Sequence, residues 1–422
     1  MRKEAKGTGT ALTFALFGAT GDLAAQKIFP ALEGLFLEGA LGAEPRIVAI
    51  GRRDWDDAAF ATFLRESSKV SSGAFLSRVS YAFVDIEAGK GFKELAAAIG
   101  PGDAVFYSSL APALHGPAIK GLRDAGLLRR GSGGGRVMVE KPFGTDYQSA
   151  CELDRFLASF LDEGQIYRVD HYLGKETVRA VMDVHEGTAH WGRLMTSESV
   201  KEIKVRMYEE RGVEGRGASY DGVGAFRDVG QNHMLEMLAA IAADYTGDWQ
   251  SDRALALRHL EPPAKTCELS RRGQYQGYHA EKGVRPGSTT ETAFEVVATF
   301  ASGKLKGVPL VLEAGKKMGA SEAFIEVFFQ DISGLPQGMR FSVQPEQEVA
   351  LTARDGSVER YAIPRRRDAY GNVILAALRG ERRSFVGRQE IEALWSYADH
   401  VVACWGKVPL EIYGKDRPFL LD

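Results

Sequence analysis

The stretch Leu12-Thr13-Phe14-Ala15-Leu16-Phe17-Gly18-Ala19-Thr20-Gly21-Asp22-Leu23-Ala24 decides how the first half of this chain folds. Its apolar beginning predicts a buried strand, and the spacing of apolar residues over 28–36 predicts a helix after it. Gly18 permits a tight turn between the two, Gly21 lets a phosphate approach the backbone, and Ala24 is small enough for close helix packing. A strand, a turn and a helix in this order are typical of a dinucleotide-binding unit.

The same pattern continues along the chain, where short apolar runs alternate with helical stretches. These runs cover residues 12–17, 46–51, 79–84, 104–109, 136–140 and 165–169. The alternation predicts an α/β domain over residues 1–170 with a Rossmann-type, doubly wound parallel sheet.

The pattern changes after Asp170. The β-rich runs 202–208, 292–299, 324–329 and 339–344 are no longer separated by regular crossover helices. We therefore expect an α+β domain over residues 171–422, with a large, mostly antiparallel sheet covered by helices on one face. The predicted domain boundary directly follows the last strand of the parallel sheet. Because ligands of open α/β sheets bind beyond the carboxyl ends of the strands, we expect both domains to contribute to the site.

Length and composition limit the class of protein. At 422 residues the chain exceeds the usual size of a single core. It is 45% hydrophobic and 26% charged, and no stretch approaches the roughly 20 apolar residues of a membrane span. A formal charge of −3 gives no field suited to nucleic acid, so any anionic ligand must be held by local basic residues. We expect neither a membrane nor a nucleic-acid partner.

The cysteines are few and far apart. Cys151, Cys267 and Cys404 are an odd number at wide spacing, which argues against a disulfide framework and against a cysteine-based metal site. No apolar signal segment lies near Met1. We therefore predict a reducing, cytoplasmic location and no metal.

A second informative stretch is Asp170-His171-Tyr172-Leu173-Gly174-Lys175-Glu176, which follows an apolar strand. If a helix begins here, His171 and Lys175 are four apart and project from one face of its first turn. The free N–H groups of a helix start point the same way, so the pattern favours a phosphate site. The alternative interpretation is a solvated, charged helix start.

The end of the second predicted strand reads Gly51-Arg52-Arg53-Asp54. Two guanidinium groups there suit the 2′-phosphate of NADP, whereas a carboxylate such as Asp54 suits the ribose of NAD. NADP is favoured and NAD stays possible. Arg52 and Arg53 can also be interpreted as exposed loop charges.

A third polar cluster, Arg227-Asp228-Val229-Gly230-Gln231-Asn232-His233, precedes an apolar helical run. Oxidation of an alcohol by a nicotinamide needs a base near neutral pKa, and histidine meets that need. The density of polar groups around His233 favours this role over a structural one. Asp170 is the candidate carboxylate to orient the imidazole, although the sequence alone does not show that the two meet.

Together these motifs resemble the glucose-6-phosphate dehydrogenase family, of which this chain is a short member. The resemblance rests on 18–24 with Lys27, on Glu140-Lys141-Pro142-Phe143-Gly144, on 168–176, and on 227–233. It implies NADP-preferring oxidation of C1 of glucose 6-phosphate to 6-phosphoglucono-δ-lactone, the first step of the oxidative pentose phosphate pathway. It also implies a homodimer or homotetramer and a cis peptide before Pro142.

The family pattern also assigns roles to residues. It implies that His233 is the general base and Asp170 its partner. The implied substrate residues are His171, Tyr172, Lys175, Glu209, Asp228, Lys316 and Lys141. The coenzyme residues predicted from the glycine turn, from the end of the second strand and from the resemblance are together Gly18, Ala19, Thr20, Gly21, Asp22, Leu23, Lys27, Arg52, Arg53, Lys141 and Pro142.

The chain departs from the family in several places. Where members usually carry a second basic residue five positions after Lys316, this chain has Ser321 followed by Glu322, and Lys317 is a possible substitute. The segment 184–190 lacks the residue pattern that is usual in the family. The C-terminal end is shorter than in typical members, so we do not transfer a second, structural NADP site.

These departures keep two rival functions open. One is a dehydrogenase of a related amino- or deoxy-sugar 6-phosphate. The other is a non-catalytic regulatory paralogue that binds a nucleotide or sugar phosphate. The joint presence of Asp170, Lys175, Asp228 and His233 argues against the second, because a silent binder needs only some of them.

Overall fold

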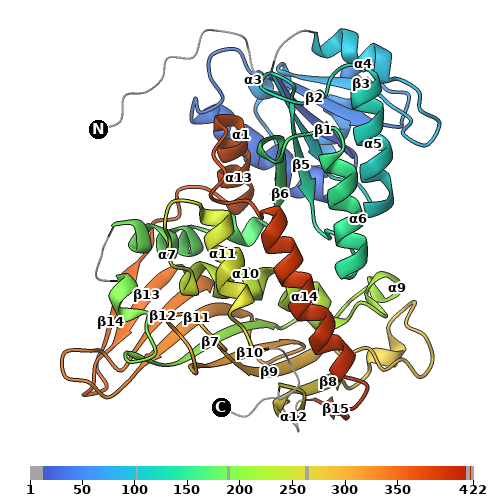
Figure 1. Ribbon diagram of the computed structural model, residues 1–422. Helices are drawn as coiled ribbons and strands as arrows, with labels where there is room; N and C mark the ends of the chain where they lie inside the picture. Colours follow the sequence, from blue (N-terminus) through green and yellow to red (C-terminus); the bar gives the residue numbers. More distant parts are fainter. Residues whose placement is uncertain (1–12, 101–102, 188–190, 262–265, 415–418, 420–422) are drawn as a thin grey trace. The chain divides into compact units, whose positions relative to one another are not determined.

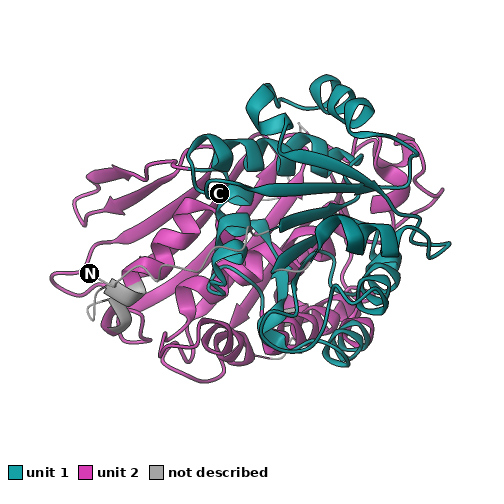
Figure 2. Ribbon diagram, turned by 90° about the horizontal axis from the view of Figure 1, so that it is seen from above, with its two compact units in different colours: residues 1–144, 151–171, 367–386 teal, residues 145–150, 172–366, 387–422 magenta. Residues whose placement is uncertain are grey.

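The structure is a computed structural model that describes residues 13–100, 103–187, 191–261, 266–414 and 419 (Figure 1). The chain forms two compact units (Figure 2). Unit 1 comprises Met1–Gly144, Cys151–His171 and Arg367–Val386, and unit 2 comprises Thr145–Ala150, Tyr172–Arg366 and Gly387–Asp422. The chain thus leaves unit 1 between His171 and Tyr172, inside the proposed phosphate segment, and returns to it for residues 367–386.

Unit 1 contains a six-stranded parallel sheet of strand order β3-β2-β1-β4-β5-β6. Its strands are β1 (Thr13–Phe17), β2 (Arg46–Gly51), β3 (Val79–Phe83), β4 (Ala104–Ser108), β5 (Arg136–Glu140) and β6 (Ile166–Val169). Strand β1 pairs with both β2 and β4, so the strand order reverses beside it. The predicted Rossmann-type, doubly wound sheet is confirmed.

Helices cover both faces of this sheet (Figure 1). They are η1 (Ala24–Ile28), α1 (Phe29–Leu37), α2 (Asp57–Ser67), α3 (Gly73–Leu76), α4 (Phe92–Ile99), α5 (Pro112–Asp124), α6 (Tyr147–Ala158), η2 (Glu163–Gln165) and α13 (Ala369–Arg379). One face carries a continuous apolar core, in which α1, α2, α3 and α13 pack on the strands.

The last of these helices, α13, begins and ends where its local sequence requires. The Asp368 carboxylate accepts a hydrogen bond from the N–H of Gly371 at 2.6 Å and caps the first turn. Gly380 follows the helix with φ +75°, a conformation that suits glycine. The side chains of Val373, Ile374 and Ala377 in α13 are buried in the core of unit 1.

Unit 2 contains a nine-stranded sheet of strand order β14-β13-β12-β11-β7-β10-β9-β8-β15. Its strands are β7 (Val200–Glu209), β8 (Arg271–Tyr275), β9 (Ala293–Thr299), β10 (Pro309–Lys316), β11 (Glu322–Phe329), β12 (Gly338–Gln344), β13 (Glu348–Thr352), β14 (Val358–Ala362) and β15 (Leu410–Tyr413). Only the pairs β7–β10 and β8–β15 among these strands are parallel. The predicted α+β architecture with a mostly antiparallel sheet is confirmed.

The helical elements of unit 2 include those that carry the polar motifs. They are α7 (Glu176–Gly187), α8 (Trp191–Leu194), α9 (Gly217–Tyr220), η4 (Phe226–Met234), α10 (Leu235–Ala242), α11 (Trp249–Arg258), α12 (Thr266–Leu269), η5 (Tyr278–Ala280) and α14 (Arg388–Cys404), and η3 (His171–Gly174) crosses the unit boundary. On β10 the alternate residues Leu310, Leu312 and Ala314 are buried, and the strand packs against η4. No helix among the described residues is long and apolar enough to cross a membrane.

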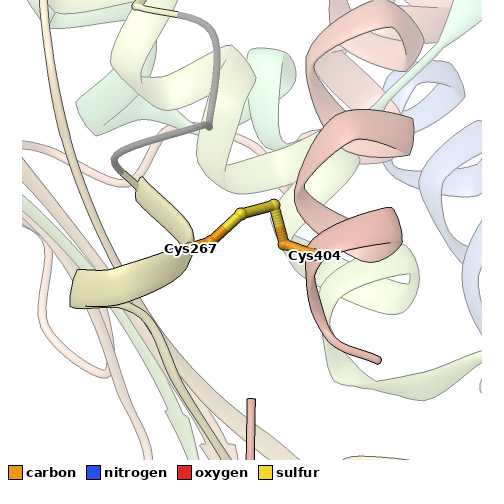
Figure 3. The surroundings of a disulfide bond; sticks show 2 residues. All are labelled: Cys267 and Cys404. Carbon is orange, nitrogen blue, oxygen red and sulfur yellow. A yellow bond between two sulfur atoms is a disulfide. The ribbon is translucent and has the colours of Figure 1, made fainter. Parts of the chain in front are cut away.

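The wide spacing of the cysteines argued against a disulfide framework, but one pair does form a disulfide. Cys267 of α12 is bonded to Cys404, the last residue of α14, across 137 positions of sequence (Figure 3). Strands β8 and β15, which follow these two helices, pair in the sheet and bring both cysteines to one place. Spacing along the chain does not report that proximity. The cysteines therefore no longer support a reducing compartment, and the cytoplasmic location stays a prediction.

Candidate active site

A cavity of about 250 Å³ lies in unit 1 at the carboxyl ends of strands β1 to β4. It is lined by Phe17, Gly18, Thr20, Gly21, Ile50, Gly51, Arg52, Val84, Asp85, Ile86, Glu87, Ser109, Leu110, Ala111 and Leu114. Gly18 has φ +73°, and a Cβ atom there would lie 2.1 Å from the carbonyl oxygen of Ser109. Only glycine fits this turn without moving the end of β4.

The other predicted coenzyme residues lie outside the lining of this cavity. Ala19 is fully buried in the core, and Asp22, Leu23, Lys27, Lys141 and Pro142 line no part of it. The guanidinium of Arg53 lies over the rings of Trp55 and Phe63, at 4.6 and 5.7 Å from their centres. The two neighbouring arginines therefore differ, because Arg52 lines the cavity and Arg53 packs on aromatic rings.

The sequence interpretation missed Asp85, Glu87 and Ser109, which also line the cavity. All three follow parallel strands of the sheet, and ligands of such sheets bind beyond the carboxyl ends of the strands. The positions of Asp85, Glu87 and Ser109 just after predicted strands could therefore have identified them from the sequence. A glycine turn, an open cavity and Arg52 together fit a phosphate-bearing dinucleotide.

The Glu140-Lys141-Pro142 motif follows β5, and the peptide between Lys141 and Pro142 is cis, as the resemblance implies. Glu140 is buried and accepts a hydrogen bond from the hydroxyl of Tyr107. Burial raises the pKa of Glu140 to about 7, and the nearby charge of Asp170 acts in the same direction. Asp170 itself is only 1% exposed, so two carboxyl groups lie buried at this end of the sheet.

The proposed phosphate segment does not form one helical turn, and that expectation is wrong. Residues His171–Gly174 form a 3₁₀ turn, and α7 begins only at Glu176. Because a 3₁₀ turn repeats every three residues, His171 and Lys175 do not share one helical face. The His171 ring stacks on Tyr370 of α13, with 5.3 Å between ring centres. The Lys175 ammonium lies 5.3 Å from the ring centre of Tyr172.

In unit 2 the polar motif 226–234 forms a π-helix, η4, rather than the start of an α-helix. The π-helix is rare in proteins, and where it does occur it often lies at a functional site. His233 is 4% exposed, and its ring stacks on Tyr172 with 4.2 Å between ring centres. The side-chain oxygen of Asn232 accepts a hydrogen bond from the N–H of His233 at 2.8 Å. A histidine is thus held in a buried, polar setting one turn after Asp228.

Lys316 joins two carboxylates of this cluster. Its ammonium lies 2.7 Å from Glu209 and 3.2 Å from Asp228, and its side chain is 3% exposed. Lys316 ends β10 and pairs with Glu209 at the end of β7, whereas Asp228 comes from η4. The structure therefore brings together Tyr172, Glu209, Asp228, His233 and Lys316 within unit 2. Asp170 and His171 belong to unit 1, and the pairing of Asp170 with His233 stays a prediction.

Lys317 does not join the carboxylates of Lys316. Its ammonium lies 4.5 Å from the ring centre of Tyr275 and 3.8 Å from Glu281. The Ser321 hydroxyl accepts a hydrogen bond from the N–H of Glu210 at 3.0 Å. Glu322 pairs instead with Arg206 and Arg340. The unusual segment 184–190 lies partly outside the described residues.

The matching family models follow the two halves of the chain. Residues 15–180 match the model described as glucose-6-phosphate dehydrogenase, NAD binding domain, and residues 187–417 match its C-terminal domain. The chain belongs to the glucose-6-phosphate dehydrogenase family. It is therefore an oxidoreductase that uses a nicotinamide dinucleotide.

Individual members of the glucose-6-phosphate dehydrogenase family resemble this chain over most of its length. A glucose-6-phosphate 1-dehydrogenase of Helicobacter pylori strain 26695 is 31% identical, over 92% of each chain. The crystal structure of the enzyme from Mycobacterium avium is 29% identical with a TM-score of 0.82, over 96% of this chain and 94% of that one. A glucose-6-phosphate dehydrogenase in complex with glucose 6-phosphate is 25% identical with a TM-score of 0.86, over 98% of both chains.

Proposed function

We infer that this chain oxidises C1 of glucose 6-phosphate to 6-phosphoglucono-δ-lactone, the first step of the oxidative pentose phosphate pathway. The observation that carries this inference is the charged cluster of unit 2, in which η4 supplies both His233 and the Asp228 that contacts Lys316. Similarity to a glucose-6-phosphate dehydrogenase in complex with that sugar supports the choice of substrate.

Each residue of the cluster then has a role in the reaction. His233 takes the proton of the C1 hydroxyl while the C1 hydride leaves, so a carbonyl bond forms at C1. A bound nicotinamide dinucleotide supplies the hydride acceptor. Glu209 and Asp228 accept hydrogen bonds from sugar hydroxyls, and the ammonium of Lys316 contacts both carboxylates.

We further propose that Asp170 orients the imidazole of His233 and stabilises its charged form. His171, Tyr172 and Lys175 hold the phosphate of the sugar, and Lys141 serves both sugar and coenzyme. Cationic side chains and a tyrosine hydroxyl can donate hydrogen bonds to the phosphate oxygens. We assign residues 1–170 to the nucleotide-binding domain and 171–422 to the substrate domain, with residues 367–386 as the part of the second stretch that packs in unit 1. We propose a cytoplasmic homodimer or homotetramer.

We also propose that NADP is the preferred coenzyme. Arg52 supports this, because it lines the cavity at the end of β2, where a 2′-phosphate is held in such sheets. Asp85 and Glu87 line the same cavity, and their carboxylates repel the negative charge of a 2′-phosphate. The preference for NADP therefore depends on the positive charge of Arg52. Arg53 is not part of this site in our proposal.

A steady-state screen of hexose 6-phosphates with NADP and NAD tests the function. We expect reduced coenzyme to form with glucose 6-phosphate, and with a lower KM for NADP than for NAD. Turnover with an amino- or deoxy-sugar 6-phosphate but not with glucose 6-phosphate would instead favour the first rival.

His233→Asn separates an enzyme from a regulatory binder. We expect kcat to fall by about 10²–10⁴-fold while sugar-phosphate binding, measured by calorimetry, is retained. The matched control is His259→Asn, since the partly exposed His259 contacts Ser302 and lies outside the cluster. If the unaltered chain binds the sugar phosphate without turnover, the regulatory paralogue is the better description.

A further inference from the structure

The edge strand β15 places a buried tyrosine beneath the charged cluster of unit 2. Tyr413 ends this strand and is 3% exposed. Its hydroxyl donates to the carbonyl oxygen of Lys316 at 2.5 Å, and its oxygen lies 3.0 Å from the hydroxyl of Thr292. Burial raises the pKa of Tyr413, so the hydroxyl keeps its proton and stays a donor.

The carbonyl that Tyr413 contacts lies where β10 ends. The N–H of Lys316 donates to the carbonyl of Thr292 at 2.9 Å, but the strand does not continue beyond Lys316. Lys317 adopts φ +53°, which turns the chain away from the sheet. A buried carbonyl at such a strand end needs a donor from elsewhere, and the hydroxyl of Tyr413 supplies it.

The position of the backbone at the end of β10 determines where the ammonium of Lys316 lies. The ammonium must meet Glu209 at 2.7 Å and Asp228 at 3.2 Å, and these two groups come from different elements. Without a donor to its carbonyl, the backbone at Lys316 is free to shift, and a shift of its Cα moves the ammonium and weakens both contacts. We propose that Tyr413 is a positioning residue, whose hydroxyl fixes the backbone of Lys316 so that its ammonium meets both carboxylates.

Contacts along the chain hold Tyr413 itself in place. The N–H of Gln276 donates to the carbonyl of Tyr413 at 2.7 Å, and β15 pairs with β8. Trp405, which directly follows the disulfide at Cys404, is buried and packs edge-on against Phe226, the first residue of η4. The segment from Cys404 to Tyr413 thus supports two of the elements that supply the cluster, η4 and β10.

The test removes only the hydroxyl. This inference rests on the proposed function, because it presupposes that Lys316 and its carboxylates bind the sugar. In Tyr413→Phe we expect the KM for glucose 6-phosphate to rise about threefold to tenfold, while the KM for the coenzyme stays unchanged. A merely structural role predicts a lower Tm with no selective change in one KM.

The matched control is Tyr397→Phe. Tyr397 is also buried in unit 2, but its hydroxyl has no hydrogen-bond partner among the described residues. We expect both KM values of this variant to equal those of the unaltered chain. An equal rise of the sugar KM in both variants would overturn the role of Tyr413.

A second measurement asks whether the effect passes through Lys316. In a Lys316→Ala background, Tyr413→Phe is expected to add less than a twofold further rise of the sugar KM, because the ammonium is already gone. A full additive effect would contradict the proposal. If the unaltered chain turns over but Tyr413→Phe leaves KM unchanged, Tyr413 alone loses its role. No turnover of any hexose phosphate by the unaltered chain removes both proposals.

Discussion

The cavity of unit 1 that we assign to the coenzyme and the charged cluster of unit 2 are built from different parts of the chain. The cavity depends on backbone shape, because Gly18 at φ +73° leaves no room for a side chain beside Ser109. The cluster depends on side-chain charge, because Lys316 holds two carboxylates together. A steric change should therefore damage the first, and a change of charge should damage the second.

Removal of the central charge is expected to have the largest effect. Lys316→Met leaves Glu209 and Asp228 without their shared cation, so we expect kcat/KM for the sugar phosphate to fall about 300-fold. The KM for the coenzyme should stay unchanged in steady-state assays. The matched control is Lys317→Met, because that ammonium lies over Tyr275 and is half-exposed. An equal loss in both variants would show that position in the cluster does not matter.

A single added methyl group is expected to damage the cavity of unit 1. The Cβ of Gly18→Ala would lie 2.1 Å from the carbonyl of Ser109, so the turn or the end of β4 must shift. We expect kcat/KM for the coenzyme to fall about 100-fold while calorimetry still detects sugar-phosphate binding. In Gly34→Ala, where the methyl group meets nothing within 4 Å, coenzyme kinetics should be unchanged. Normal coenzyme kinetics in Gly18→Ala would break the contrast.

Each unit also contains a buried carboxyl group whose pKa is raised by burial from 4.5 to about 7, Glu140 in unit 1 and Glu291 in unit 2. An acid whose pKa is higher in the folded state contributes stability below pH 4.5, and that stability is lost as the pH rises to about 7. We expect each group to lower the free energy of unfolding by about 1–3 kcal/mol across this interval.

Urea unfolding at a series of pH values measures this effect. Glu140→Gln and Glu291→Gln should each flatten the dependence on pH, and by similar amounts, because both shifts have the same cause. A flattened profile in only one variant would show that the two units differ in how water reaches their carboxyl groups. Unaltered profiles in both variants would contradict the assignment.

The smallest effect concerns two adjacent arginines. Arg52→Ala should raise the KM for NADP about tenfold and leave the KM for NAD nearly unchanged, because only a 2′-phosphate needs this cation. Arg53→Ala should change neither KM more than twofold, since its guanidinium packs on Trp55. Coenzyme titrations of both variants test this. The reverse result would assign the 2′-phosphate to Arg53.

Local requirements explain what the sequence could predict. Gly18 and the alternating apolar runs report backbone conformation and burial one element at a time, and the two sheets follow from them. His233, Asp228 and Lys316 were predicted from residue types and the family resemblance, and the structure brings them together in unit 2.

Features that depend on distant pairing could not be predicted in the same way. The bond between Cys267 and Cys404 and the contact of Tyr413 with Lys316 both require β15 to pair with β8, across more than a hundred residues. The stacking of Tyr370 on His171 requires α13 to return to unit 1. The prediction that one helix begins at His171 was wrong for a different reason. A 3₁₀ turn and the start of an α-helix favour the same local residues, so the sequence does not show that α7 begins only at Glu176.

The late return of α13 has a consequence for synthesis of the chain. All six strands of the parallel sheet are complete at Val169, yet part of the apolar layer on one face comes from Val373 to Phe385. A ribosome that adds roughly 5–20 residues per second needs on the order of ten seconds or more to travel between these points. During that interval the nascent sheet has an uncovered apolar face. An amino-terminal fragment that stops before α13 should therefore depend on chaperones and aggregate when they are scarce.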